Sequence, residues 1–191
     1  MVGRHTALST THNTSSTGAT RSGTIVSVVG WHNVGKTAFV ERLIGALKAR
    51  GVRVATVKHS REDFYIDHQG TDTWRYRRAG SDVVVITAPG RMAMIEERDD
   101  EAGLDEIIAR LPAGIDVIIT EGFKRLPIKK IEVTTREAWH ADGRITPKGL
   151  LLALVSDDEV TEAHDAPLFR RDDVEGVVAL LEDLGMVKPA V

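Results

Sequence analysis

Residues 24–47 read TIVSVVGWHNVGKTAFVERLIGAL, and this run contains the pattern G-x-x-x-x-G-K-[ST] at positions 30–37. The β-branched residues before the pattern predict a buried strand at 24–29, and the spacing of the apolar residues after it predicts a helix at 38–47. A strand, a glycine-bearing loop and a helix in this order are the context that a phosphate-binding (Walker A) loop requires. The stretch therefore predicts a site for a nucleoside triphosphate, with a chance match in a turn as the alternative.

The residue types in the loop match the chemistry of a polyphosphate. A glycine at each end lets backbone N–H groups turn toward phosphate oxygens, and the N-terminus of the following helix adds partial positive charge. The ammonium of Lys36 adds a full charge, and the hydroxyl of Thr37 can hold Mg²⁺. The motif reveals neither the base nor the fate of the γ-phosphate. The residues predicted to contact the nucleotide are Gly30, Trp31, His32, Asn33, Val34, Gly35, Lys36, Thr37 and Ala38.

Composition limits the class of protein. A chain of 191 residues that is 42% hydrophobic can bury one substantial core, so we expect a single domain over 23–188. The first 22 residues are rich in Ser and Thr and contain no acidic residue, which predicts a disordered tail. Cysteine is absent, which excludes disulfides and thiolate metal sites and favours a cytoplasmic location. A net charge of −3 argues against general nucleic-acid binding, and no apolar run approaches the roughly 20 residues that span a bilayer.

The rest of the chain alternates between strand and helix patterns. Further strands are predicted at 52–57, 82–87, 91–97, 115–120, 130–134 and 150–155, and further helices at 71–79, 104–111 and 173–184. This order predicts an α/β fold with a mainly parallel sheet flanked by helices, of the P-loop NTPase type. Ligands of such sheets lie at the C-terminal ends of the strands. The segments to inspect are therefore 30–37, 58–67, 87–91, 121–124 and 156–159.

Two carboxylates at these strand ends are candidate Mg²⁺ ligands beside Thr37. Glu121 ends an apolar strand and could hold the metal or one of its waters, and an exposed turn carboxylate is the alternative. Asp116 begins the same strand, about 16 Å away at ~3.3 Å per residue, and should face the opposite edge of the sheet. Asp67 lies in the irregular segment after the second strand, where it could reach the metal, orient water, or be an ordinary solvated side chain.

Several cations could assist phosphate binding. Lys58 ends the second strand and could pair with phosphate, while His59 could be a base or a packing residue. The segment WRYRR at 74–78 could bind anions or form a solvated face with Trp74 in the core. Because they follow strand ends, Arg91 and the group Lys124, Arg125, Lys129 and Lys130 are expected to converge near the nucleotide.

Read together, these segments resemble one family, the MobB proteins of molybdenum-cofactor maturation. The resemblance runs from about residue 24 to 158 and rests on the phosphate loop, VKH at 57–59, ID at 66–67, GTDTWR at 70–75, EGFK at 121–124 and KIEV at 130–133. It implies GTP as the nucleotide, weak hydrolysis at most, a homodimer, and association with a MobA-type nucleotidyltransferase that attaches a guanine nucleotide to molybdopterin. Trp31 and His32 depart from the family's loop, which is usually richer in small residues.

Recognition of guanine is not specified by a common signature, because the pattern Asn-Lys-x-Asp is absent. Asp157 and Asp158 follow an apolar strand and are the best candidates to accept from the guanine ring, with helix capping as the alternative. We therefore expect a GTP- and Mg²⁺-binding adapter in which Lys36 and Glu121 support any slow hydrolysis. Molybdopterin, or the partner enzyme, could meet the surface at 74–78. A small-molecule kinase and a regulatory switch read through segment 60–70 are the rival interpretations.

Overall fold

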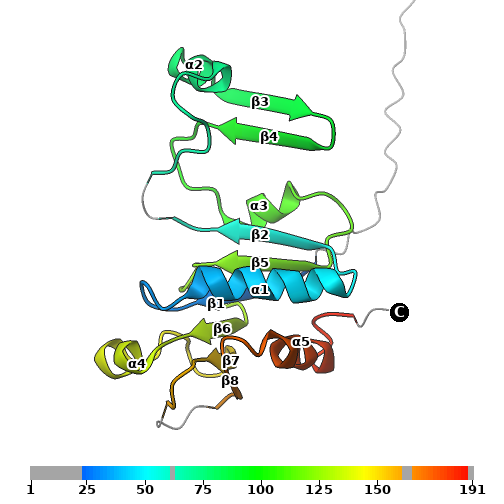
Figure 1. The fold of residues 1–191 in the computed structure, drawn as a ribbon. Coiled ribbons are helices and arrows are strands. Elements are labelled where there is room, and N and C mark those ends of the chain that lie inside the picture. Colours follow the sequence, from blue (N-terminus) through cyan, green and yellow to red (C-terminus); the bar gives the residue numbers. More distant parts are fainter. Residues whose placement is uncertain (1–22, 61–62, 161–164, 189–191) are drawn as a thin grey trace, which may run out of the picture.

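A computed structural model gives the structure of the chain and describes residues 23–60, 63–160 and 165–188. The tail predicted at 1–22 lies outside the described residues, and the domain bounds stay a prediction. Among the helices described, none has both the length and the apolar character that a bilayer span needs. Along the chain the elements are β1 (Thr24–Val29), α1 (Lys36–Ala49), β2 (Val54–Lys58), α2 (Asp72–Arg78), β3 (Val83–Ala88), β4 (Arg91–Glu96), α3 (Leu104–Ala109), β5 (Val117–Glu121), β6 (Lys130–Val133), α4 (Arg136–Asp142), β7 (Leu151–Val155), β8 (Leu168–Phe169) and α5 (Val174–Asp183) (Figure 1).

Six strands form one parallel sheet in the order β2-β5-β1-β6-β7-β8, so that β1 lies in its interior (Figure 1). Val28 of β1 lies opposite Glu121 of β5 and Ile131 of β6. The C-terminal ends of these three strands therefore share one edge of the sheet, where the loops of α/β proteins bind ligands. The predicted α/β class with a mainly parallel sheet flanked by helices is confirmed.

The main core lies between the sheet and two helices. On α1 the buried residues Phe39, Leu43 and Leu47 recur every four positions and form one stripe, which the helical periodicity of the sequence predicts. α5 packs beside α1 with its own buried residues, and both helices cover the face of β1 that carries Val26 and Val28. This packing fixes the start of α1, and with it the loop that precedes α1.

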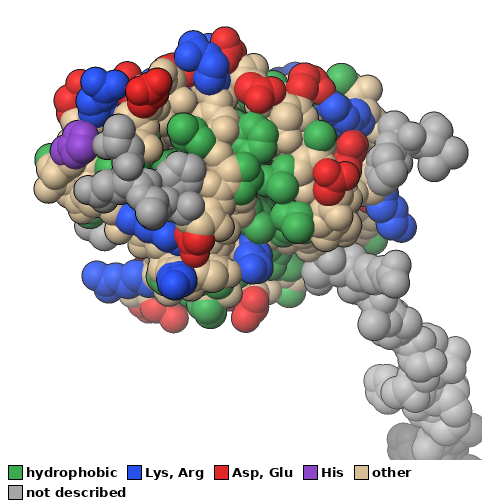
Figure 2. All heavy atoms as spheres, turned by 90° about the horizontal axis from the view of Figure 1, so that it is seen from below, with side chains coloured by type: hydrophobic (Ala, Val, Ile, Leu, Met, Phe, Trp, Pro, Cys, Tyr) green, Lys and Arg blue, Asp and Glu red, His purple; other side chains and the backbone are tan. Residues whose placement is uncertain are grey.

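The lower end of the molecule in Figure 1 carries α4, β7, β8 and α5. Here Trp139 of α4 packs with Leu154 and Val160 in a second cluster. Seen from below, hydrophobic side chains gather in the middle of this end and charged side chains surround them (Figure 2). β8 is the edge strand of the sheet, and its Leu168 is exposed.

β3 and β4 form a separate antiparallel hairpin rather than part of the parallel sheet. The turn Pro89-Gly90 returns the chain directly, and Gly90 has the positive φ (+80°) that such tight turns favour. In Figure 1 the hairpin and α2 lie together at the upper end of the molecule. The expectation that 87–91 lies at the ligand edge of the main sheet is therefore wrong, because a two-residue turn cannot cross over to a parallel strand.

The other predicted elements are present, with ends that differ by a few residues. Two elements were not predicted, α4 and β8. α4 begins after Thr135, whose side chain accepts a hydrogen bond from the backbone N–H of Ala138. β8 has two residues, which are too few to show the alternation that marks a strand.

Candidate nucleotide-binding site

The loop between β1 and α1 has the backbone shape of a phosphate cradle. Gly35, directly before α1, has a φ of +88°, in the region that glycine favours. A Cβ on Gly30 would lie 2.3 Å from the backbone oxygen of Val133, so only glycine fits at that position. No side chain caps the first turn of α1. Its N–H groups can therefore serve an anion.

Lys36 bends back across this loop, where its Nζ donates to the backbone oxygen of Trp31 at 2.6 Å. Burial is the main cause that lowers the pKa of Lys36 below its usual value. Lys124 and Lys58 lower the pKa further, and Glu121 raises it. The charged form of Lys36 is therefore disfavoured by burial and by the positive charges of Lys124 and Lys58. A bound polyphosphate would relieve both, so the electrostatics fit an anionic ligand.

Glu121 reaches the loop from the end of β5. The Thr37 hydroxyl lies 3.5 Å from both carboxylate oxygens, which is too long for a strong hydrogen bond. Nζ of Lys58 lies 3.6 Å from Oε1 of Glu121. The structure thus brings together three residues that the sequence predicted for the site, Thr37, Lys58 and Glu121.

Thr37 and Glu121 supply the hard oxygen ligands that Mg²⁺ prefers. Mg²⁺ takes octahedral oxygen ligands at about 2.0–2.1 Å and usually keeps waters and substrate phosphates among them. A hydroxyl and two carboxylate oxygens that face each other without a strong bond of their own fit this demand. In the described part of the chain, no three His, Asp or Glu side chains are grouped to hold a metal ion. A Mg²⁺ here would take its remaining ligands from phosphate and water.

Strand β5 explains why Glu121 faces the loop and Asp116 does not. Glu121 lies in register with Val28 and Lys58 at the C-terminal edge of the sheet. Asp116 precedes β5 and accepts from the backbone N–H of Arg53 at 2.8 Å, at the opposite edge. The carboxylates before β5 and at its end therefore lie at opposite edges of the sheet.

Trp31, an unusual residue for this loop, connects the loop to two other segments. Its Nε1 donates to the backbone oxygen of Gly143, at the C-terminal end of α4, at 2.9 Å. Nζ of Lys124 lies 4.6 Å from the centre of the Trp31 ring, which is a cation–π contact. The Trp31 side chain thus braces the loop against α4, while His32 and Asn33 are exposed.

Among the cations predicted to converge, Lys124 contacts the loop through the Trp31 ring. Lys130 is fully buried, and its Nζ donates to two backbone oxygens of the preceding segment. Lys129 donates to the backbone oxygen of Gly149, and Arg91 belongs to the separate hairpin. The expectation that these three converge on the nucleotide is wrong, because Lys130 starts β6 and the start of a parallel strand lies away from the ligand edge.

The two carboxylates after β7 have different roles. Asp158 accepts from the backbone N–H of Arg136 at 3.0 Å, at the first residue of α4, so it has the capping role. Asp157 accepts from the backbone N–H of Arg171 at 3.0 Å and is partly exposed. Asp157 thus lies in the part of the site that follows β6 and β7, and its contact with guanine stays a prediction.

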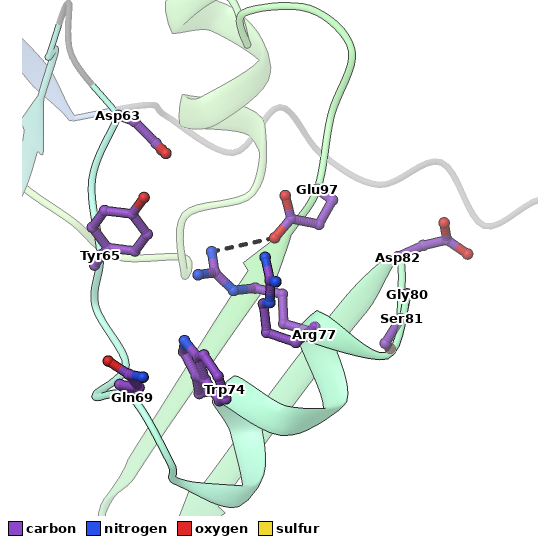
Figure 3. Close-up of a pocket in the computed structure, with 10 residues that line it drawn as sticks. Asp63, Tyr65, Gln69, Trp74, Arg77, Gly80, Ser81, Asp82 and Glu97 are labelled. Carbon is purple, nitrogen blue, oxygen red and sulfur yellow. Dashed lines mark ion pairs between the residues drawn. The ribbon is translucent and has the colours of Figure 1, made fainter.

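Asp67 faces α2 instead of the loop. Its carboxylate lies 3.8 Å from Nε of Arg77, and both carboxylate oxygens are buried without a hydrogen-bond partner. Arg77 also pairs with Glu97 at 3.3 Å (Figure 3). The structure pairs the carboxylate of Asp67 with Arg77 and does not place it at the phosphate loop. A metal role for Asp67 stays a prediction.

Three residues of the predicted cluster at 74–78, Trp74, Arg77 and Arg78, line an open cavity of about 640 Å³ beside the hairpin (Figure 3). Guanidinium groups lie against aromatic rings on this surface, Arg77 at 5.8 Å from the Tyr65 ring and Arg78 at 5.9 Å from the Trp74 ring. Trp74 is only partly buried and lines the cavity, so its placement in the core is wrong. The reason is that α2 packs on a two-stranded hairpin, which offers too little surface to bury a whole helix face.

His59 contacts a carboxylate and an aromatic ring. Its Nε2 lies 2.7 Å from Oε1 of Glu101, and its ring centre lies 5.1 Å from that of Phe123. These contacts correspond to the packing interpretation of His59. Arg171 was not predicted, although its guanidinium lies beside Gly35. It follows the two-residue strand β8, which gives no periodic signal.

Comparison with known proteins agrees with this architecture. The model of the MobB family, described as molybdopterin guanine dinucleotide synthesis protein B, matches residues 25–157. The chain is 32% identical over 156 residues to the molybdopterin-guanine dinucleotide biosynthesis adapter protein of Escherichia coli K12, a match that covers 80% of this chain and 88% of that protein. It is 30% identical over 165 residues to the probable adapter protein of Bacillus subtilis 168, which covers 84% and 92% of the two chains.

Solved structures give the same result. The crystal structure of Bacillus subtilis MobB superposes with a TM-score of 0.67 at 28% identity, covering 86% of this chain and 98% of that one. The crystal structure of molybdopterin-guanine biosynthesis protein B has a TM-score of 0.65 at 32% identity, with 84% and 99% covered. The fold is therefore of the P-loop NTPase type, and the chain belongs to the MobB family of molybdopterin-guanine dinucleotide biosynthesis adapter proteins.

Proposed function

We propose that this chain binds GTP with Mg²⁺ in the loop between β1 and α1 and, in that state, assists a MobA-type nucleotidyltransferase that joins a guanine nucleotide to molybdopterin. The observation that carries the proposal is the triad Lys36, Thr37 and Glu121. It combines a phosphate cradle, a lysine whose pKa is lowered by burial, and oxygen ligands for the metal.

The same arrangement supports a proposal of slow hydrolysis. Fast phosphoryl transfer to water needs a positioned water and a cation on the γ-phosphate, such as an arginine finger. Glu121 is engaged by Lys58 and faces Thr37, so its geometry suits a metal ligand better than a base. We propose that Lys36 and Glu121 support weak GTPase activity at most, and that the chain acts in the cytoplasm.

The first prediction tests nucleotide binding directly. Lys36→Ala should lower GTP affinity at least tenfold, because a charge-assisted contact with phosphate is lost while no core volume changes. Isothermal titration calorimetry with GTP and Mg²⁺ measures the change. Lys48→Ala is the matched control, since Lys48 lies at the other end of α1. Equal affinity of wild type and Lys36→Ala would contradict the proposal.

The same preparation separates the adapter from a small-molecule kinase. A kinase uses the same loop but must also bind an acceptor and transfer the γ-phosphate to it. Incubation with γ-labelled GTP or ATP and a pool of metabolites should label no small molecule. Transfer of label to a metabolite would replace the adapter proposal with the kinase.

The surface around Trp74–Arg78 is proposed as the meeting place with the transferase, or with molybdopterin itself. Its rings and guanidinium groups offer stacking for a ring system and hydrogen bonds for a phosphate or an acidic side chain. Both occupants use the same side chains, so only binding experiments separate them.

A further inference from the structure

The side chain of Arg171 is held against the phosphate loop by three elements. Its Nη2 donates to the backbone oxygen of Thr134, after β6, at 3.2 Å. Its backbone N–H donates to Asp157, after β7, and its Nε lies 3.6 Å from the same carboxylate. Its backbone oxygen accepts from the guanidinium of Arg42 on α1 at 3.2 Å. These contacts fix both the backbone and the guanidinium.

The guanidinium lies directly beside the glycine that precedes α1. A Cβ placed on Gly35 would lie 3.3 Å from Nη1 of Arg171, so Nη1 is within contact distance of the loop. Nε is buried and has no hydrogen-bond partner. A cation with an unsatisfied N–H is thus held beside the uncapped N-terminus of α1, where positive potential already collects. The Asp157 carboxylate, 3.6 Å from Nε, balances part of this charge, and Nη1, on the loop side, is placed to donate to an anion bound there.

The sheet order tells which part of a nucleotide lies on this side. The metal-side residues Glu121 and Lys58 end β5 and β2, which lie on one side of β1. Thr134 and Asp157, the partners of Arg171, follow β6 and β7 on the other side. A triphosphate whose metal-bound end lies at Thr37 and Glu121 must therefore extend its nucleoside end toward Arg171.

We propose that Arg171 is a nucleotide-binding residue whose guanidinium donates to the phosphate nearest the nucleoside, with Asp157 as the positioning residue that holds it there. This inference rests on the proposed GTP function. A guanidinium suits the task because its fork of N–H groups can bind phosphate while another N–H keeps the contact with Thr134. Because the guanidinium of Arg171 contacts the phosphate nearest the nucleoside, it should contribute equally to the affinities for GTP and GDP.

The test compares two ligands and four variants by calorimetry. Arg171→Gln should lower the affinity for GTP and for GDP by a similar factor, roughly tenfold or more, because one charge-assisted contact is lost in both. Arg171→Lys should recover part of both affinities, since it keeps the charge. Asp157→Asn should lower both by a smaller factor and keeps Arg171 itself. Arg170→Ala is the matched control, because Arg170 is exposed and pairs with Asp172.

The outcomes separate this inference from the proposed function. A loss confined to GTP would mean that Arg171 reaches the γ-phosphate, and unchanged affinity for both ligands would mean that it contacts neither, so each result overturns the inference alone. Absence of nucleotide binding in the wild type would overturn the proposed function together with the inference. Thermal unfolding shows whether each variant is folded, and Arg171→Lys supplies the test if Arg171→Gln is not.

Discussion

At the scale of single residues, Glu121 connects the metal side of the site to its cations. It faces the Thr37 hydroxyl and the Lys58 ammonium, and its charge raises the pKa of Lys36 against the effect of burial. A Mg²⁺ held between Thr37 and Glu121 would take the place of the Lys58 ammonium beside the carboxylate. The negative charge of Glu121 would then compensate the charge of the metal instead of the charges of Lys36 and Lys58.

We therefore expect Glu121→Gln to lower the Mg²⁺-dependent part of GTP affinity by roughly tenfold, because a neutral amide oxygen is a weaker ligand for Mg²⁺ than a carboxylate. Thr37→Ala should act in the same direction. Calorimetry with GTP in Mg²⁺ and in excess chelator measures the two parts separately. Asp116→Asn is the control from the same segment, since Asp116 contacts Arg53 at the far edge. Equal effects of the two carboxylate changes would show that neither holds the metal.

The residues that could be predicted are those in a local pattern. The phosphate loop is contiguous, and Glu121 ends an apolar strand, so spacing alone predicted that the two lie at the same edge of the sheet. Arg171 could not be found in this way, because its place depends on β8, on the bend at Asp157 and on the packing of α5 against α1. Its link to Gly35 spans more than a hundred residues and has no local signature.

At the scale of elements, β6 shows why a family-like segment need not be functional. Lys130 and Glu132 lie on one strand and are fully buried. Lys130 donates to two backbone oxygens, and burial lowers its pKa. Glu132 accepts from the backbone N–H groups of Ile145 and Thr146 at 2.8 and 2.9 Å. Both charges organise loops around the sheet, a role that the sequence cannot distinguish from ligand binding.

The hairpin β3–β4 exposes large apolar side chains on one of its faces. Val85 lies opposite Met94, and Thr87 lies opposite Met92, so these side chains share one face. Val85, Met92 and Met94 are 52%, 71% and 51% exposed, which is unusual for large apolar residues in a strand pair. A lone two-stranded sheet is marginal in water. We expect a second copy of the chain to cover this face, as the family resemblance also implies.

Met94→Glu should therefore shift the protein from dimer to monomer, because a charge on an apolar contact face is costly to bury. Light scattering coupled to size-exclusion chromatography measures the mass. Leu184→Glu is the control, as Leu184 is equally exposed (51%) but follows α5 at the other end of the molecule (Figure 1). A wild type that is monomeric at high concentration, or a Met94→Glu variant that stays dimeric, would refute this use of the hairpin.

At the scale of the whole molecule, the alternation of strands and helices predicted the class and the ligand edge, since both follow from local periodicity and general rules of parallel sheets. The division into a sheet and a separate hairpin was not predicted. This division depends on which strands pair. The turn at Pro89-Gly90 indicates that β3 pairs with β4, but it does not tell whether the hairpin joins the main sheet. The result is a molecule with its phosphate loop on the main sheet and α2 beside the separate hairpin (Figure 1). Exposed aromatic and cationic side chains lie on α2.

This separation of sites leads to the last prediction, which concerns the transferase. An adapter that loads nucleotide on the sheet can meet a partner through α2, where Arg75 and Arg78 are exposed. Arg75→Glu combined with Arg78→Glu should weaken capture of a MobA-type transferase by about tenfold or more, because two cations of the surface become anions. Pull-down with purified transferase, quantified by titration, measures the loss.

The matched control for this pair is Arg136→Glu combined with Lys148→Glu, which makes the same change in charge on two exposed residues of the α4 end. Calorimetry with GTP should show equal nucleotide affinity for both double variants, since neither pair touches the phosphate loop. Equal capture by both would place the transferase elsewhere. Capture that persists in the α2 variant while binding of molybdopterin is lost would assign the Trp74–Arg78 surface to the pterin, whose phosphate needs the same guanidinium groups.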